Sequence, residues 1–187
     1  MAAMPSQKHR MLAGESYFAN DPELVADRRR ARLLGERLNA GSSAEPDLRR
    51  EILDDLLGAL GDQAEILSPF YCDYGFQITV GARTFINFGT VILDSAPVRI
   101  GDDVQIGPGV RLVTPIHPLD PAQRRTLIES AASIEIGDGA WLATGVIVCP
   151  GVTVGAGTVV GAGSVVTKDL PAGQLAFGNP CRVVRKL

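Results

Sequence analysis

Histidine is scarce in this chain, which has only His9 and His117 among 187 residues. Protein sites for catalytic zinc commonly combine three side-chain ligands, with histidine prominent among them. Two histidines exclude every site that requires three. Cysteine is also sparse, because Cys72, Cys149 and Cys181 are odd in number and form no Cys-x-x-Cys pair. This usage is typical of a reduced compartment, and we expect the protein in the cytoplasm.

A charge excess and long apolar runs are missing too. Eighteen Lys and Arg residues against 21 Asp and Glu residues give a net charge of −3. The sequence as a whole therefore offers no electrostatic case for nucleic acid or an acidic membrane as a partner. No apolar run approaches the roughly 18 residues of a membrane span, and MAAMPSQKHR lacks the apolar stretch of a signal peptide. Aromatic residues make up only 5% of the chain, so the core must be built from small aliphatic side chains.

Helical patterns occupy the first part of the chain. Asp21-Pro22-Glu23 supplies a cap residue, a proline in the first turn and an early acid, and predicts a helix that ends near Gly41. Leucine and isoleucine at helical spacing predict a second helix over residues 46–60. The run Arg28-Arg29-Arg30 is interpreted as a solvated face of the first helix.

A period of six residues replaces the helical pattern from Ile78 onward. The aliphatic positions of this series are Val80, Ile86, Ile92, Ile100, Ile106, Leu112, Ile136, Leu142, Val148, Val154, Val160 and Val166. Six matches neither the 3.6 of a helix nor the alternation of a plain strand. It suits a triangular prism with six residues on each face, in which one coil of a parallel β-helix takes about 18 residues. Each aliphatic side chain then points inward, about 4.8 Å from its equivalent in the next coil.

The repeat divides the chain into a helical N-terminal region, residues 1–61, and an all-β repeat region, residues 62–187. An ordinary β-sandwich would instead show alternating strands with turns every 8–12 residues or so. The period is interrupted once, and we predict that an excursion loop leaves the prism at about 113–135. Repeat proteins often place function in such insertions, and His117 lies near the start of this one.

Motifs along the whole chain resemble one group of acyltransferases. The six-residue repeats fit those of the hexapeptide acyltransferases, with glycine often following the aliphatic position. Further matching segments are Met11-Leu12-Ala13-Gly14-Glu15, Cys72-Asp73-Tyr74-Gly75, Asn87-Phe88, Leu93-Asp94, Thr114 to Pro118, Trp141, Val166 to Asp169 and Gly178-Asn179-Pro180. Together they resemble the maltose and galactoside O-acetyltransferases, including the nodulation acetyltransferases. The resemblance implies a left-handed parallel β-helix, acetyl-CoA as co-substrate, no metal, and a homotrimer with its sites between neighbours.

The resemblance implies that His117 is the catalytic base. Transfer of an acetyl group from a thioester to a sugar hydroxyl needs a base for the hydroxyl proton and donors for the tetrahedral oxyanion. Histidine suits the first role because its ordinary pKa of about 6.5 leaves it largely neutral at pH 7. Asn87 matches an asparagine near the acetyl group that supports the acceptor or the transition state, with capping of a coil corner as its alternative role. Direct attack in a ternary complex needs no acyl-carrying cysteine, and Cys149 is interpreted as a packing residue.

Four acidic residues are assigned to the acceptor side by the same resemblance. Asp94 matches the acidic position that faces the sugar, and Glu129 matches a glutamate that can orient the imidazole. Asp73 stands where galactoside enzymes have a serine. Asp21 is the nearest counterpart of an acid in the N-terminal arm, with helix capping as its alternative role.

The coenzyme side is expected along the later coils. The resemblance assigns it to Trp141, Ala143, Thr144, Ala162, Thr167, Lys168, Arg182 and Arg185. Trp141 is expected to pack against the cofactor arm. Lys168, Arg182 and Arg185 are expected to form a cationic group for the phosphates, unless they are a solubilising tail.

Two other classes of function are possible for a β-helix, and the sequence argues against both. A metal-dependent lyase on the same type of helix, such as the γ-type carbonic anhydrases, needs three histidines. A non-catalytic β-helix with an ice-binding face needs outward Thr-x-Thr rows, which the sequence lacks. Within the acetyltransferase reading, a chitin-type oligosaccharide or a non-sugar alcohol is the alternative acceptor.

Overall fold

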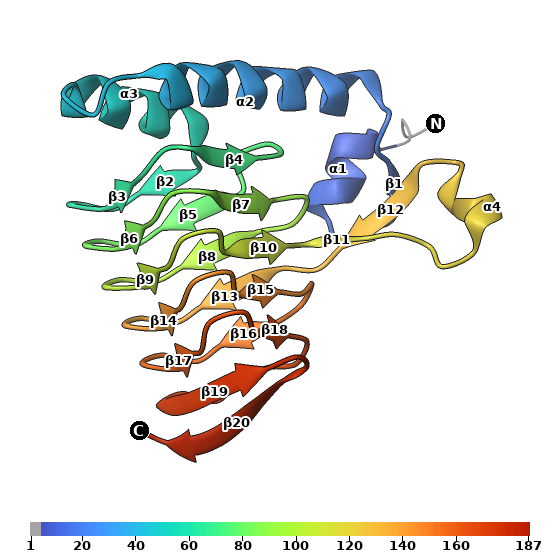
Figure 1. The fold of residues 1–187 in the computed structure, drawn as a ribbon. Helices are drawn as coiled ribbons and strands as arrows, with labels where there is room; N and C mark the ends of the chain where they lie inside the picture. Colours follow the sequence, from blue (N-terminus) through green and yellow to red (C-terminus); the bar gives the residue numbers. More distant parts are fainter. Residues whose placement is uncertain (1–4) are drawn as a thin grey trace.

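The computed structural model describes residues 5–187 and shows a triangular parallel β-helix that is covered at one end by helices (Figure 1). The helices are α1 (Gln7–Leu12), α2 (Pro22–Ala40), α3 (Pro46–Leu56) and the short α4 (Pro121–Arg124). The helix expected after Asp21 is confirmed, and Asp21 Oδ1 accepts a hydrogen bond from the Glu23 backbone N–H at 3.0 Å. None of the helices in residues 5–187 is long and apolar enough to cross a membrane.

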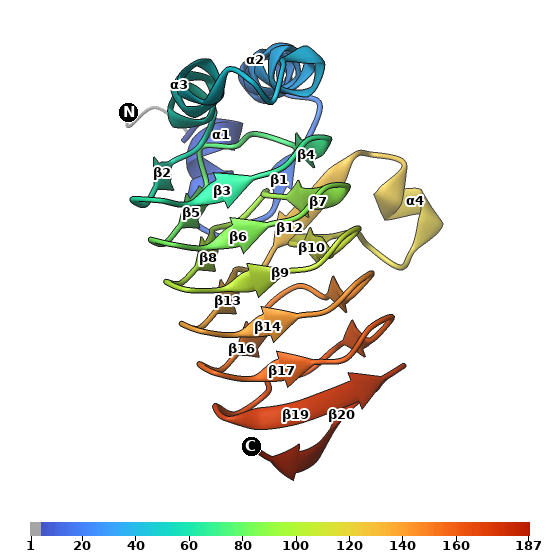
Figure 2. The same ribbon diagram turned by 60° about the vertical axis from the view of Figure 1, so that its left-hand side comes forward.

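Three sheets form the faces of the prism, which Figure 2 shows from a second side. Sheet 1 contains β2 (Ala59–Leu60), β5 (Ile78–Val80), β8 (Val98–Ile100), β13 (Ile134–Ile136) and β16 (Thr153–Val154). Sheet 2 contains β3 (Glu65–Ile66), β6 (Phe85–Ile86), β9 (Gln105–Ile106), β14 (Trp141–Leu142), β17 (Val159–Val160), β19 (Gln174–Gly178) and β20 (Cys181–Lys186). Sheet 3 contains β4 (Phe70–Cys72), β7 (Thr90–Leu93), β10 (Arg111–Val113), β15 (Ile147–Val148) and β18 (Val165–Val166). Only the β19–β20 pair in these sheets is antiparallel.

Each coil passes from sheet 1 to sheet 2, then to sheet 3, and returns to sheet 1. We name the edges of the prism by the sheets that they join: the 1–2 edge, the 2–3 edge and the 3–1 edge. All twelve aliphatic positions of the six-residue series are inside the prism, none more than 3% exposed. The parallel β-helix expected from the repeat is therefore confirmed.

The length of a coil changes along the prism. After the excursion 18 residues separate paired positions, as between Ile147 and Val165. Before it the separation is 20, as between Val91 and Arg111. The two additional residues fall at the 3–1 edge, because the inward positions Cys72 and Val80 are eight apart while the other steps of the coil are six. The excursion leaves the prism at this same edge, so every insertion into the repeat lies there.

The helices α2 and α3 close the first coil and share its core. Leu38 and Leu53 are buried in the same apolar cluster as Phe70 and Ile78 of the prism. The expected end of the second helix at residue 60 is wrong, since α3 ends at Leu56 and the chain is already extended at the next residue. Strand β2 begins two residues later, so the prism starts slightly before residue 62.

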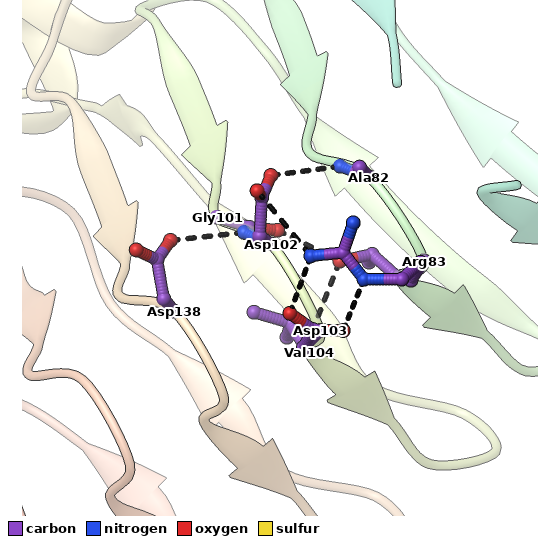
Figure 3. A network of polar contacts seen from close by, with 8 residues as sticks. Ala82, Arg83, Gly101, Asp102, Asp103, Val104 and Asp138 are labelled. Carbon is purple, nitrogen blue, oxygen red and sulfur yellow. Dashed lines mark hydrogen bonds and ion pairs between the residues drawn. The ribbon is translucent and has the colours of Figure 1, made fainter. Parts of the chain in front are cut away.

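Aspartates at the 1–2 edge bind backbone N–H groups that the turns leave unpaired (Figure 3). Asp102 Oδ1 accepts from the Ala82 backbone N–H at 2.8 Å, and Asp138 Oδ1 accepts from the Asp102 N–H at 2.9 Å. A Cβ atom at Gly101 would clash with the Asp138 carboxylate, so the turn requires glycine. Arg83 donates two hydrogen bonds of 2.6 Å to Asp103. This acidic cluster thus stabilises the corners of adjacent coils.

The excursion is an ordered hairpin. Strand β10 continues to Val113 and β13 begins at Ile134, so residues 114–133 leave the prism. Strands β11 (Pro115–Ile116) and β12 (Ile128–Ala131) pair antiparallel, with α4 at the far end. The N-terminal strand β1 (Tyr17–Phe18) adds to β12 and completes a sheet of three strands.

Candidate active site

His117 directly follows β11, at the base of the hairpin. It lines a groove of about 240 Å³ together with Ile116, Ile128, Glu129 and other hairpin residues. Its Nδ1 lies 3.4 Å from Oε2 of Glu129, and its side chain is 57% exposed against 11% for Glu129. An imidazole whose Nδ1 faces a carboxylate keeps Nε2 available for proton transfer. The expected pairing of Glu129 with the imidazole is thus present in the geometry.

Asp94 lies close to this region at the 3–1 edge, but it is fully buried. Its Oδ1 accepts hydrogen bonds from the backbone N–H groups of Asp73 at 3.1 Å and Tyr74 at 2.8 Å. Its Oδ2 is buried without a hydrogen-bond partner in residues 5–187. Burial raises the pKa of Asp94 to about 6, and the nearby charge of Asp73 adds to the effect. In a single chain the carboxylate that was expected to face the sugar is therefore enclosed, and one of its oxygens has no hydrogen-bond partner.

Asp73 and Asp21 have different surroundings. Burial raises the pKa of Asp73, and the positive charge of Arg28 partly offsets this. The carboxylate of Asp21 caps α2, which is the alternative role that the sequence left open. The prediction that Arg28 lies on a solvated helix face is wrong. Its Nη1 donates to the Tyr74 hydroxyl at 2.5 Å, and its Nη2 donates to the Ala19 carbonyl at 2.6 Å.

A second groove of about 240 Å³ follows the 2–3 edge. Asn87, Trp141, Ala143 and Thr144 line it, so four of the expected site residues meet there. The Trp141 side chain is 51% exposed. Ala162 lies at the same edge one coil further on, where the Gly163 N–H donates to the Thr144 carbonyl at 2.9 Å. Small side chains along this edge leave room for an extended ligand.

The two grooves lie at opposite edges of sheet 3. Asn87 precedes β7 at the 2–3 edge, whereas His117 follows β10 and β11 beyond the 3–1 edge. The groove at His117 is not lined by Asn87, and the groove at Asn87 is not lined by His117. A single chain therefore does not assemble the expected catalytic pair.

The expected cationic group is divided in the same way. Thr167 and Lys168 follow β18 at the 3–1 edge, while Arg182 and Arg185 lie on β20 of sheet 2. Arg185 pairs with Leu175 in the same outward column as Trp141. Arg182 and Arg185 therefore share a sheet with Trp141, and Lys168 does not.

Comparison with known proteins agrees with the repeat and the helical cap. Residues 10–61 match the family description "Maltose acetyltransferase hexapeptide capping motif", and residues 133–168 match "Bacterial transferase hexapeptide (six repeats)". Nodulation protein L of Rhizobium meliloti (strain 1021) is 46% identical over 178 residues, which cover 95% of this chain and 97% of that protein. The chain belongs to the hexapeptide-repeat acetyltransferases of the maltose and galactoside group.

Solved structures of this family superpose over nearly the whole chain. A maltose O-acetyltransferase from Clostridium difficile 630 is 40% identical, with a TM-score of 0.96 and 99% of each chain covered. A hexapeptide-repeat acetyltransferase of Vibrio cholerae O1 biovar eltor, complexed with acetyl coenzyme A, is 37% identical, with a TM-score of 0.91. That match covers 98% of this chain and 99% of the other.

The described residues 5–187 show no cluster for a metal ion, and the thiols of Cys72 and Cys181 are not activated. No group of three His, Cys, Asp or Glu side chains there is arranged to hold a metal ion. The three cysteines are free thiols, and burial raises the pKa of both Cys72 and Cys181. A thiol with a raised pKa is a poor nucleophile at neutral pH, which agrees with packing roles for these two residues.

Two tyrosines near the site were missed by the sequence analysis. Tyr17 and Tyr74 are each 1% exposed, and both use their hydroxyl groups in polar contacts. Tyr74 occurs in the quoted Cys72-Asp73-Tyr74-Gly75 segment, but nothing in the repeat assigns a contact to its side chain. For Tyr17 the only signal was its place shortly after the matching segment that ends at Glu15.

Proposed function

We propose that the protein transfers an acetyl group from acetyl-CoA to a sugar hydroxyl by direct attack in a ternary complex, with His117 as general base. The observation that carries the proposal is the His117–Glu129 pair at the base of the hairpin. Support comes from the maltose O-acetyltransferase and the acetyl-CoA complex among the relatives. A chitin-type oligosaccharide or a non-sugar alcohol is the alternative acceptor, and location in the cytoplasm stays a prediction.

In the proposed reaction the imidazole of His117 takes up one proton and later gives it to the leaving group. Neutral His117 removes the hydroxyl proton as the acceptor oxygen attacks the thioester carbonyl carbon. The tetrahedral oxyanion collapses, the carbon–sulfur bond breaks, and the imidazolium returns its proton to the coenzyme thiolate. The Glu129 carboxylate, 3.4 Å from Nδ1, stabilises the imidazolium between these steps. Asn87 is proposed as a donor to the oxyanion.

We propose a homotrimer from the side chains that point outward on each of the three faces, which form one column of paired residues along each sheet. Sheet 1 presents Ala59, Thr79, Arg99, Glu135 and Thr153. Sheet 2 presents Phe85, Trp141, Val159 and Leu175 beside Glu65, Gln105 and Arg185, and sheet 3 presents Tyr71, Val91, Ile147 and Val165 beside Arg111. A closed ring of identical subunits uses two different faces of each. Two apolar faces and one polar face fit that requirement, and a neighbouring copy can bring the Asn87 groove to His117.

Light scattering at micromolar concentration is expected to return about three times the 19.8 kDa of one chain. The reason is that the apolar faces of sheets 2 and 3 bury more surface when three copies close around an axis. Replacing Trp141 on sheet 2 by Glu is expected to weaken the trimer more than the same change at Thr153 on sheet 1. A 19.8 kDa species for the unaltered protein would contradict the proposal.

Removing the cations of β20, as in the Arg182→Ala/Arg185→Ala double variant, is expected to raise the KM for acetyl-CoA at least tenfold at low salt. Phosphate contacts remote from the thioester are nearly the same in the ground and transition states, so their loss leaves kcat largely unchanged. Two charge-assisted contacts of about 1.5–3 kcal/mol each support an effect of this size, which salt should reduce. The KM for the acceptor should barely move. An unchanged KM for acetyl-CoA with a weakened acceptor would place the coenzyme elsewhere.

The acceptor is best identified by a panel. The purified protein is supplied with acetyl-CoA and, in separate reactions, glucose, maltose, a galactoside, a chitin-type oligosaccharide and a simple alcohol. Release of the coenzyme thiol is then measured. Acceptor-dependent release supports the proposal, and absence of release with every acceptor contradicts it.

A further inference from the structure

A small apolar cluster separate from the prism core lies beside the candidate site. Met11 of α1, Tyr17 of β1, Leu24 of α2 and Tyr74 at the 3–1 edge are all buried in it. The cluster joins the N-terminal arm to the edge from which the hairpin projects. It therefore fixes the Tyr17 ring from several elements at once.

The Tyr17 hydroxyl reaches the proposed catalytic pair. It donates a hydrogen bond of 2.5 Å to Oε1 of Glu129, whose other oxygen lies 3.4 Å from His117 Nδ1. The pairing of β1 with β12 sets Tyr17 directly opposite Glu129. The two oxygens of one carboxylate are thus divided between a buried tyrosine and the imidazole.

We propose that Tyr17 is a positioning residue for the acetyl-transfer reaction, holding the Glu129 carboxylate in the orientation that faces His117. Its kinetic consequences rest on the function proposed above, because Tyr17 acts only through Glu129.

Three physical points support this role. Burial raises the pKa of the Tyr17 phenol well above its usual range, so the hydroxyl remains a donor at any working pH. A carboxylate side chain that is only 11% exposed needs donors from the protein. Without the hydroxyl, the negative charge of Glu129 is less stabilised, so its attraction for a proton on the facing imidazole increases.

Other charged and titratable groups face Glu129 from the elements around it. They are His117 after β11, Tyr17 on β1, Asp73 and Tyr74 at the 3–1 edge, and Arg28 of α2 beside that tyrosine. All except Tyr17 are retained when only the Tyr17 hydroxyl is removed. A change in the titration of the pair therefore reports that hydroxyl.

The test is Tyr17→Phe, with Tyr74→Phe as a matched control. Both variants remove a buried hydroxyl from the same cluster, but the Tyr74 hydroxyl contacts Arg28 rather than Glu129. We expect Tyr17→Phe to lower kcat about tenfold with little change in either KM, since alignment of the base matters most in the transition state. The acid-side midpoint of kcat/KM should rise by about half a unit to one unit. Tyr74→Phe should stay within twofold of the unaltered protein.

A double-variant cycle and a titration complete the experiment. In a Glu129→Gln background, Tyr17→Phe should have no further effect on kcat. The imidazole of His117 is one of only two in the chain, so proton NMR can follow its titration, and Tyr17→Phe should raise its midpoint even if no acetyl transfer is found. The proposal is overturned if that midpoint is unmoved, if Tyr74→Phe loses as much activity, or if the two effects are additive.

Discussion

Replacing His117 by alanine is expected to lower kcat by about two to four orders of magnitude, the usual range for loss of general acid–base help. The residue lies at the base of a hairpin outside the prism, and its side chain is more than half exposed. Its removal therefore leaves no cavity in the stacked core, and the fold and the oligomer should be retained. Steady-state kinetics and circular dichroism of the same preparation test both statements.

His9 provides the matched control for this experiment. It is the only other histidine, and it is exposed on α1. His9→Ala should leave kcat and the pH profile unchanged. A loss of less than tenfold in the His117 variant at saturating substrates would require another base for the reaction.

Replacing Asp94 by asparagine is expected to change how stability depends on pH. Burial raises the pKa of Asp94 to about 6 in the folded protein, against an ordinary value of 3.8. The folded protein therefore retains this proton between about pH 4 and 6 while the unfolded chain has lost it. The raised pKa of Asp94 therefore contributes stability that is fully present below the pKa of the unfolded chain. This contribution is lost as the pH rises through the pKa of the folded protein. Asparagine has no proton to lose in this range, so the variant should lack this contribution.

The expected size follows from the shift of about two pKa units, which corresponds to about 3 kcal/mol. The free energy of unfolding of Asp94→Asn minus that of the unaltered protein should therefore increase by that amount as the pH is raised from 4 to 7. Above pH 7 this difference should change little. Asparagine can still accept from the backbone N–H groups of Asp73 and Tyr74 through its Oδ1. Urea unfolding at several pH values measures the difference. A difference that does not vary with pH would show that folding leaves the pKa of Asp94 at its ordinary value.

The period of six was sufficient to predict the prism because inward residues repeat at a fixed spacing in the sequence. The same six-residue spacing could also have predicted that the two grooves lie at different edges of the prism. Asn87 follows Ile86, an inward position of sheet 2, whereas His117 follows Leu112, an inward position of sheet 3. Assigning successive inward positions to sheets 1, 2 and 3 in turn therefore places the two residues at different edges. The family resemblance, by contrast, groups both residues in one catalytic site.

The Tyr17 contact could not be predicted by any such count. Its partner Glu129 is 112 residues away, and neither residue belongs to the repeat. The pairing depends on how the N-terminal arm crosses the hairpin, which only the packing of the small cluster determines. Burial of Asp94 was hidden for a related reason, since the two additional residues at its corner disturb the repeat locally.

Confinement of every insertion to the 3–1 edge has a consequence for how such a protein can change. Adding or deleting residues at that edge lengthens one corner without moving the inward positions of the next coil out of alignment, because each coil returns to sheet 1 at the same point. The 1–2 edge lacks this freedom, since the Asp102 and Asp138 contacts link backbone positions of successive coils. If the proposed sites hold, acceptor preference can diverge by loop length at the 3–1 edge, while the coenzyme groove proposed at the 2–3 edge keeps a constant spacing from coil to coil.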